Sequence, residues 1–387
     1  MDFAVTEEQQ LIIATTRDFV RHELVPHERE VEDSGVLREE LWRELRQRAI
    51  GAGLYAANMP AEVGGAGLDA VSWVLYEKEL GHTSYALQYS CVARPSNILL
   101  ACAGEQRERY LLPTVRGERV ECLAMSEPQA GSDLRSMKTS AVEKGGDFIV
   151  NGTKHFISHA DHADFVILFA VTAEEETPRG KRRLMTSFLV DKGTPGFEVL
   201  PGYRNVSHRG YNNSILKFSD CRLPKSAVLG TVHQGFEVAN TWLGATRLQV
   251  AANCLGRAER ALEAAKQWAV DRVQFGQQIG KFQGVSFKLA DMAVELRAAE
   301  LLTLEAAWKL EHKSASDADM AMAKLKATEM LAMVADEALQ IHGGMGLMSE
   351  MPLERIWRDA RIERIWDGTS EVQRHIISRA LLRPLGG

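Results

Sequence analysis

The chain has 387 residues, of which 45% are hydrophobic and 25% are charged, and its formal net charge is −6 at pH 7. This length suits two or three packed units, and the composition is typical of a folded globular protein. No apolar run reaches the roughly 18 residues that a membrane helix needs, and an acidic chain without a basic cluster argues against nucleic acid or an anionic membrane as partner.

Residues 1–118 are predicted to form a helical domain. The chain starts MDFAVTEEQQLIIATTRDF, which has acidic residues and no long apolar centre where a secretory signal has basic and apolar ones. Thr6 and Gln9 instead have the spacing of a capping box at the start of a helix. Asp69 is placed to cap a later helix and Gly81 to end it. We therefore expect a cytoplasmic protein whose first domain is helical.

Residues 119–230 are predicted to form a β-domain. Short runs rich in β-branched and aromatic residues, such as DFIVNGTKHFIS and LMTSFLVDK, are separated by turn pairs such as Asn151-Gly152 and Thr194-Pro195. Short strands with frequent turns favour an antiparallel sheet, arranged as a small barrel or sandwich.

Residues 231–387 are predicted to form a bundle of long helices, because glycine and proline become rarer and Ala-, Leu- and Met-rich stretches return. One predicted helical face carries Val285, Leu289, Met292 and Leu296. The Met-rich segment from Met320 to Met333 is interpreted as core packing, since methionine fills irregular gaps between helices. The fold class is therefore α+β, with helical, β and helical units in that order.

The cysteines and histidines predict neither a disulfide framework nor a metal site. The chain has five cysteines, Cys91, Cys102, Cys122, Cys221 and Cys254. Their odd number and wide spacing, without any C-x-x-C pair, predict buried thiols. Histidines cluster between His155 and His162, but Ile157 stands where an H-x-H-x-D-H metal motif needs its first histidine. Arg94 is expected to bury its stem and keep its charge at the surface.

The stretch from Gln340 to Arg374 holds a glycine cluster at one end and the carboxylate of Asp367 at the other. Thr369 and Ser370 follow Asp367 closely, and such hydroxyls cap the unpaired N–H groups that open a helix. Asp367 is thus placed on the turn before a helix, where its side chain can face a pocket.

Five segments resemble, in order, motifs of the flavin-linked acyl-CoA dehydrogenase family. They are SEPQAGSD against T-E-P-x-A-G-S-D, KHFISHA against K-x-W-I-T-N-G, DRVQFG against R-x-x-F-G, QIHGG against Q-x-x-G-G, and WDGT against Y-E-G-T. The resemblance covers essentially the whole chain. It implies an N-terminal helical domain, a central antiparallel β-domain and a C-terminal four-helix bundle, with FAD between the last two. It also implies an acyl-CoA substrate, electron-transferring flavoprotein as acceptor, and a homo-oligomer, either a tetramer or a dimer.

The same motifs imply which residues hold FAD and substrate. Those implied to contact FAD are Ser126, Ser132, Phe156, Ser158, Arg272, Phe275, Gln283, Gln340, Gly343, Gly344, Thr369 and Glu371. Ser132 is also implied to contact the CoA chain, and Arg247 to lie near the base and the CoA moiety. Arg272 is implied to reach the FAD pyrophosphate across a subunit contact. Phe156 replaces a family Trp, so a smaller stacking area is expected there.

The resemblance implies that Asp367 removes the α-proton of an acyl-CoA thioester while flavin N5 accepts the β-hydride. The family usually has Glu at this position, and Asp is shorter by one methylene, about 1.5 Å of reach. Some family members carry their base directly before the position of Arg247, but Thr246 occupies that place here. Dehydrogenases acting on cyclic acyl-CoA substrates also use Asp, so a cyclic or branched acyl group is one option.

Two other functions stay open at this point. Nitroalkane oxidases share this fold and use an Asp at the equivalent place, so Asp367 could act on a substrate without CoA. A DNA-associated or assembly-type family member without catalysis would be expected to show a basic face or to have lost the base. The acidic composition and the retained carboxylate of Asp367 speak against this second alternative.

Overall fold

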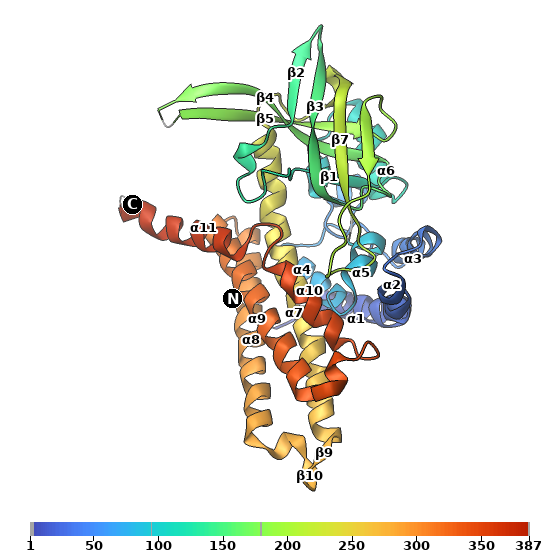
Figure 1. Cartoon of the computed structure of the whole chain (residues 1–387), viewed down its shortest axis with the longest axis vertical. Helices are drawn as coiled ribbons and strands as arrows, with labels where there is room; N and C mark the ends of the chain where they lie inside the picture. Colours follow the sequence, from blue (N-terminus) through green and yellow to red (C-terminus); the bar gives the residue numbers. More distant parts are fainter. Residues whose placement is uncertain (1–3, 94, 179, 386–387) are drawn as a thin grey trace.

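The structure is a computed structural model that describes residues 4–93, 95–178 and 180–385, so Arg94 lies outside the described residues. Figure 1 shows N-terminal helices in blue, a β-sheet domain in green and long C-terminal helices in yellow to red. This order confirms the predicted α+β class. All five cysteines are buried, as predicted, and no disulfide joins them among the described residues. None of the described helices is long and apolar enough to cross a membrane.

Most of the N-terminal helices pack around one apolar core that includes Trp42 and Leu45, whereas the last packs through Val115 on a second core shared with the β-domain. They are α1 (Glu7–Phe19), α2 (Glu28–Ser34), α3 (Glu39–Gly51), α4 (Ala70–Leu80), α5 (Tyr85–Cys91) and α6 (Leu112–Val115). The predicted capping box is confirmed, because Thr6 Oγ1 accepts from the Gln9 N–H at 3.2 Å and Gln9 Oε1 accepts from the Thr6 N–H at 3.1 Å.

The β-domain is one curved eight-stranded sheet in the order β6-β7-β3-β2-β4-β5-β8, with β1 paired to β4. Its strands are β1 (Glu121–Ala124), β2 (Ser140–Lys144), β3 (Asp147–Ser158), β4 (Phe165–Thr177), β5 (Gly180–Asp191), β6 (Phe197–Leu200), β7 (Asn213–Pro224) and β8 (Val228–Leu229). Most pairs are antiparallel as predicted, but β1 and one residue of β2 run parallel to β4. The difference arises because β1 does not reach β4 through a hairpin, so no tight turn sets its direction.

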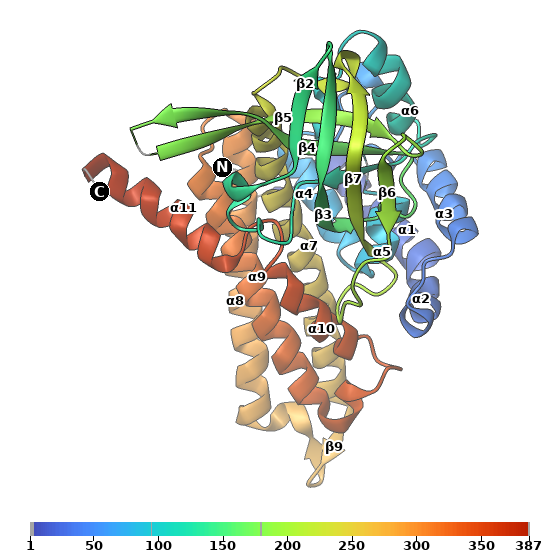
Figure 2. The ribbon, with the colours of Figure 1, turned by 45° about the horizontal axis from the view of Figure 1, so that its top comes forward.

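The C-terminal helices form a bundle of α7, α8 and α9, with the shorter α10 packed against α9. The helices are α7 (Gly235–Asp271), α8 (Gln283–Glu311), α9 (Asp317–His342), α10 (Leu353–Glu363) and α11 (Ser370–Leu382). A small hairpin of β9 (Val273–Gln274) and β10 (Gln277–Gln278) lies at the end far from the β-domain, as Figures 1 and 2 show. The predicted face of α8 is confirmed, since Met292 is fully buried and Leu289 and Leu296 pack on the same core.

The limits of α4 agree with the prediction, but the glycine at its end is required for close helix packing rather than for ending the helix. Asp69 Oδ1 caps the helix by accepting from the Ser72 N–H at 2.7 Å. Gly81 has a φ of −59°, which any residue adopts, so it is not a left-handed helix end. A Cβ at Gly81 would lie 2.4 Å from the Asn253 carbonyl oxygen, and one at Gly256 would lie 1.9 Å from a carbonyl oxygen of α4. Both glycines therefore allow α4 and α7 to cross closely.

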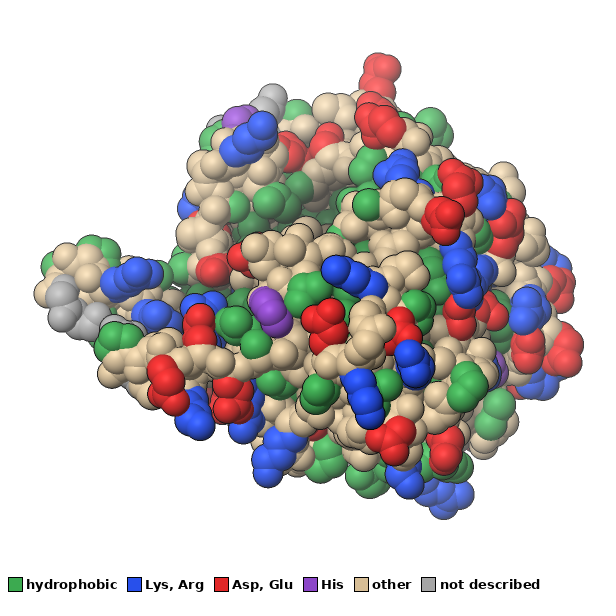
Figure 3. Space-filling view, turned by 90° about the horizontal axis from the view of Figure 1, so that it is seen from above, with side chains coloured by type: hydrophobic (Ala, Val, Ile, Leu, Met, Phe, Trp, Pro, Cys, Tyr) green, Lys and Arg blue, Asp and Glu red, His purple; other side chains and the backbone are tan. Residues whose placement is uncertain are grey.

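Charged side chains of both signs are mixed over the surface. Figure 3, which views the molecule from above, shows acidic and basic groups interspersed on that face. The long β4–β5 hairpin follows the same rule, because Glu174 pairs with Arg183 and Glu175 with Arg182 across the two strands. Such a mixture offers no extended basic face on the side that Figure 3 shows.

Candidate active site

Asp367 lies half-buried on the turn between α10 and α11. The turn is left-handed, with a φ of +50° at Asp367 and +91° at Gly368, a conformation that Asp and Gly adopt more readily than most residues. A Cβ at Gly368 would also lie 2.6 Å from the Gln373 amide nitrogen, so the turn has no room for a side chain there. Thr369 Oγ1 caps α11 by accepting from the Val372 N–H at 3.2 Å. The prediction that Asp367 precedes a capped helix is confirmed.

Burial raises the pKa of Asp367 above its ordinary value of 3.8, and nearby groups modify that rise. The Lys324 ammonium on α9 lowers the pKa, while the Glu363 carboxylate on α10 raises it. Smaller decreases in the pKa come from the Thr246 hydroxyl, which donates to Asp367 Oδ2 at 3.3 Å, and from the charge of Arg247. The carboxylate is therefore a stronger base than that of an exposed aspartate, as a proton acceptor requires.

A cavity of about 200 Å³ lies beside Thr246, between α7 and the segments around α4 and α5. Aromatic rings from Trp73, Tyr89 and Trp242 form much of its wall. Its polar lining residues include Asn58, Ser96, Asn97 and Gln249. Thr246 lines this cavity and donates to Asp367, so one hydrogen bond links the carboxyl group to the cavity wall. An apolar cavity with a few polar groups beside a carboxyl of raised pKa is typical of an active site.

Arg247 follows Thr246 on α7 and is 9% exposed. Its Nη1 lies 3.5 Å from Asp317 Oδ1, and its Nε has no acceptor within the described residues. Its charge acts on the Asp367 carboxyl, and it directly follows Thr246, whose hydroxyl donates to that carboxyl. A buried guanidinium with an unused donor is suited to an anionic or carbonyl group of a ligand.

Ser126 and Phe156 lie next to each other at one edge of the β-domain, because the Ser126 carbonyl oxygen accepts from the His155 N–H at 3.0 Å. The pairing of β3 with β7 shifts register at this point, and Phe156 takes a φ of +55°. Its ring is 54% exposed and packs 5.2 Å from that of Tyr203. An exposed ring beside a half-buried hydroxyl is suited to contact with a planar ligand.

Ser158 ends β3 and is half-buried, with its Oγ accepting from Asn213 Nδ2 at 3.0 Å. Ser132 is exposed on the loop before the short 3-10 turn Leu134–Ser136. Glu371 is exposed in the first turn of α11. The structure therefore places Ser158 on the same strand as Phe156, and Ser132 on a separate loop.

The other residues expected to contact FAD lie at the opposite end of the molecule (Figure 1). Phe275, in the β9–β10 hairpin, is 94% exposed and has a φ of +50°. The His342 ring stacks 5.0 Å from that of Trp268, which places the start of the glycine segment against the end of α7. This second group consists of Arg272, Phe275, Gln283, Gln340, Gly343 and Gly344. A single chain does not bring it together with Ser126, Phe156 and Ser158.

Sequence reasoning missed Lys324 and the aromatic walls of the cavity. Lys324 is only 1% exposed on α9, in the Met-rich segment that was predicted, correctly, to be core. A signal was present, because Lys324 follows Met320 by four residues and precedes Ala327 by three, on the buried face of the helix. A lysine at such a position needs a buried partner. Trp73 and Trp242 belong to no motif and meet only in the folded chain.

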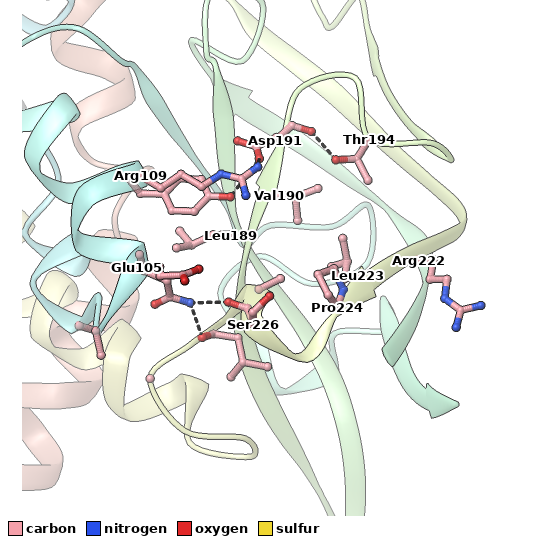
Figure 4. A pocket seen from close by; sticks show the side chains of 17 residues that line it. Glu105, Arg109, Leu189, Val190, Asp191, Thr194, Arg222, Leu223, Pro224 and Ser226 are labelled. Atoms are coloured by element: carbon pink, nitrogen blue, oxygen red, sulfur yellow. Dashed lines mark hydrogen bonds and ion pairs between the residues drawn. The ribbon is translucent and has the colours of Figure 1, made fainter. Parts of the chain in front are cut away.

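A larger cavity of about 520 Å³ lies between the segment before α6 and the ends of β5 and β7 (Figure 4). Three of its charged side chains are paired, Arg109 with Asp191, Asp191 also with Arg119 outside the lining, and Arg222 with Asp147. No predicted site residue from the described part of the chain lines it. The smaller, aromatic-walled cavity is the candidate active site, because its lining residue Thr246 donates to the Asp367 carboxyl.

Three protein-family models match successive parts of the chain. The acyl-CoA dehydrogenase N-terminal domain matches residues 6–118, the middle domain 122–221 and the C-terminal domain 233–382. The human mitochondrial short-chain specific acyl-CoA dehydrogenase is 36% identical over 97% of this chain and 90% of its own length. The chain belongs to the acyl-CoA dehydrogenase family.

Two solved structures agree with this assignment. Butyryl-CoA dehydrogenase from Megasphaera elsdenii superposes with a TM-score of 0.90 at 33% identity, over 99% of this chain and 100% of that one. The FAD complex of PigA superposes with a TM-score of 0.91 at 29% identity, over 100% of both chains. The protein is thus an acyl-CoA dehydrogenase-family oxidoreductase with FAD as its cofactor.

Proposed function

We propose that this protein removes hydrogen from the α and β carbons of an acyl-CoA thioester, with Asp367 as the base that takes the α-proton. One observation above all supports this. The Asp367 carboxyl, whose pKa is raised, accepts a hydrogen bond from Thr246, and Thr246 lines the aromatic-walled cavity. Asp367 also stands where the family's Y-E-G-T motif has its catalytic glutamate.

The reaction needs a base on one face of the substrate and an oxidant on the other. When bound, FAD supplies the oxidant, which accepts the β-hydrogen with both electrons of its C–H bond as hydride. Asp367 takes the α-hydrogen as a proton, and the electrons of that C–H bond form the new double bond. Negative charge builds on the thioester oxygen meanwhile, so fixed donors such as the Asp367 backbone N–H are needed to stabilise it. Arg247 and Ser132 would hold the CoA part.

Two groups of residues in this chain are suited to bind FAD. Each FAD would contact one group from one copy of the chain and the other group from a second copy. Phe156 offers a ring face, and Ser126 and Ser158 offer hydroxyls for the isoalloxazine edge. The exposed Arg272 and the backbone at Gly343 are suited to a pyrophosphate. Because these groups lie at opposite ends of one chain (Figure 1), each FAD would lie between two copies in a homo-oligomer, a tetramer as in the family.

Arg272→Ala is expected to lower both FAD content and oligomer size. The guanidinium would make a charge-assisted contact to phosphate worth about 1.5–3 kcal/mol, so FAD binding should weaken roughly 10- to 100-fold. The measurements are flavin absorbance per chain and mass by light scattering. Arg21→Ala, which changes an exposed arginine of the N-terminal domain, is the control. Unchanged flavin content and mass in Arg272→Ala would contradict the split site.

The substrate we propose is a compact cyclic or branched acyl-CoA. The cavity of about 200 Å³ is smaller than the roughly 300–1,000 Å³ of common ligand pockets, and Trp73 and Trp242 restrict its width. Asp367 has a shorter reach than the usual Glu, by about 1.5 Å. The shorter side chain leaves more space between the carboxylate and the α-carbon, and a substrate with a bulky substituent at that carbon needs this space.

Asp367→Glu tests both the function and the acyl shape. In anaerobic titrations with linear, branched and cyclic acyl-CoAs, the wild type should bleach its flavin fastest with a compact cyclic or branched ester. The longer side chain of the variant should match or raise the rate on linear esters and slow it on cyclic ones, because a displacement near 1 Å costs roughly 10²-fold. If the rate of flavin bleaching in Asp367→Glu changed equally for linear, branched and cyclic esters, the length of the Asp367 side chain would not determine the acyl shape.

The presence of Asp at this position also favours a second candidate, a base acting on a nitroalkane. Rapid peroxide release from nitroalkanes, with no response of the flavin to any CoA ester, would support that candidate and reject the dehydrogenase. The dehydrogenase should instead turn over faster with electron-transferring flavoprotein than in air. A non-catalytic, DNA-associated role has little support, because the net charge is −6 and surface charges are mixed (Figure 3).

A further inference from the structure

Lys324 binds the backbone on both sides of Asp367. Its Nζ donates to the Trp366 carbonyl oxygen at 2.6 Å and to the Gly368 carbonyl oxygen at 2.5 Å. The side chain is almost completely buried on α9. Two charge-assisted hydrogen bonds from one buried cation fix the orientation of both peptide groups of this left-handed turn.

The bond to Trp366 also determines where the Asp367 N–H points. The Trp366 C=O and the Asp367 N–H belong to one planar amide and point in opposite directions. Because Lys324 holds that C=O toward α9, the N–H points away from α9. Across residues 4–93, 95–178 and 180–385, this N–H has no protein acceptor. A backbone N–H in a half-buried turn requires a partner, so a ligand acceptor is expected there.

We propose that Lys324 is a positioning residue that orients and polarises the Trp366–Asp367 peptide group, so that the Asp367 N–H donates to the thioester oxygen of bound substrate. The inference rests on the proposed function, because it requires a thioester in the cavity. A cation bonded to an amide oxygen polarises the whole amide and makes its N–H a stronger donor. This donor becomes more valuable as negative charge moves onto the thioester oxygen during proton removal.

The charge of Lys324 also acts on the Asp367 carboxyl, which a packing residue would not do. The other titratable or charged groups that face Asp367 are Arg247 on α7, Glu363 on α10 and Tyr85 on α5. Lys324 lowers the pKa of Asp367. Its removal should therefore raise that pKa, and flavin reduction should begin to fall at a higher pH than in the wild type.

The experiment compares Lys324→Met with Lys326→Met in the FAD-loaded enzyme. Met keeps most of the side-chain length and removes the charge and the donors. Lys326 lies on the same helix but pairs with Glu295 on α8, so it is a matched control. The probe is the CoA thioester of a 3-arylacrylic acid, a product-like ester whose absorption moves to longer wavelength when its carbonyl is polarised.

Wild type and Lys326→Met should produce the same red shift of the bound probe. Lys324→Met should bind the probe and produce less than half of that shift. The rate of flavin reduction by substrate should fall about 10- to 100-fold. This is no larger than the rate loss that follows removal of a complete oxyanion-hole donor. The acidic limb of its pH profile should move to higher pH.

A full red shift and an unchanged pH profile in Lys324→Met would overturn the role of Lys324 and leave the proposed function intact. No red shift in the wild type would overturn the proposed function and this inference with it. If Lys324→Met yields no folded flavoprotein, Lys324→Gln, a shorter neutral donor, takes its place. That variant should show an intermediate shift, and a full shift would equally overturn the proposal.

Discussion

Asp367→Asn is expected to keep FAD and to bind CoA esters, while flavin reduction falls about 10²- to 10⁴-fold or more. The amide has nearly the shape of the carboxyl group, and its oxygen can still accept from Thr246 at the position of Oδ2. It cannot take a proton from the α-carbon. Anaerobic stopped-flow bleaching of the flavin measures the rate, and spectral titration with the same ester measures binding.

The pH dependence of flavin reduction provides a second test of Asp367 with the same variant. Because the pKa of Asp367 is raised, the wild-type rate should fall as the pH drops through that value and the carboxylate becomes protonated. The remaining rate of Asp367→Asn should lack this step. Glu198→Gln, which changes an exposed acid on β6, serves as control and should behave as wild type. Flavin reduction at an undiminished rate in Asp367→Asn would show that another group is the base.

The second large effect is expected at the ion pair between Arg257 on α7 and Glu363 on α10. Both side chains are buried and in direct contact. Burial by itself raises the pKa of Glu363, but the charges of Arg257 and His208 and their hydrogen bonds together outweigh it and lower that pKa to about 2. Trp366 Nε1 also donates to Glu363 Oε2 at 2.7 Å, so the pair holds the residue next to Asp367.

Glu363→Gln should lower the free energy of unfolding by about 3–5 kcal/mol, because it leaves the Arg257 charge buried without a counter-charge. For a chain of this length that corresponds to roughly 4–6 °C in the midpoint of thermal unfolding, measured by calorimetry on the FAD-loaded protein. Arg361→Gln, on the exposed side of the same helix, should change the midpoint little. Arg257→Met combined with Glu363→Leu should recover most of the loss, since no charge stays unpaired. An unchanged midpoint in Glu363→Gln would refute the assignment.

The lowered pKa of Glu363 also predicts how stability depends on pH. Its contribution is complete above the unfolded value of about 4.5 and is lost as the pH falls toward the folded value of about 2. The wild type should lose stability over that window. Glu363→Gln should lose less over the same window, because its amide does not titrate.

Local sequence alone determined the elements and the position of the candidate base. Thr6 and Asp69 mark helix starts because their side chains satisfy N–H groups only a few residues away. Asp367 could be placed before a capped helix for the same reason, since Thr369 lies two residues further on. The α, β, α order followed from the periodicity of apolar residues, which reports burial within each element.

Only the tertiary structure decided what surrounds Asp367. Lys324 lies more than forty residues before the turn that it binds, and in the sequence it is one lysine among the methionines and alanines of a core helix. Gly81 looked like a helix end, whereas its function is to let α7 approach α4. The direction of β1 was equally invisible. These features arise from packing between segments distant in the chain, and short-range backbone bonding and apolar periodicity carry no information about which distant surfaces meet.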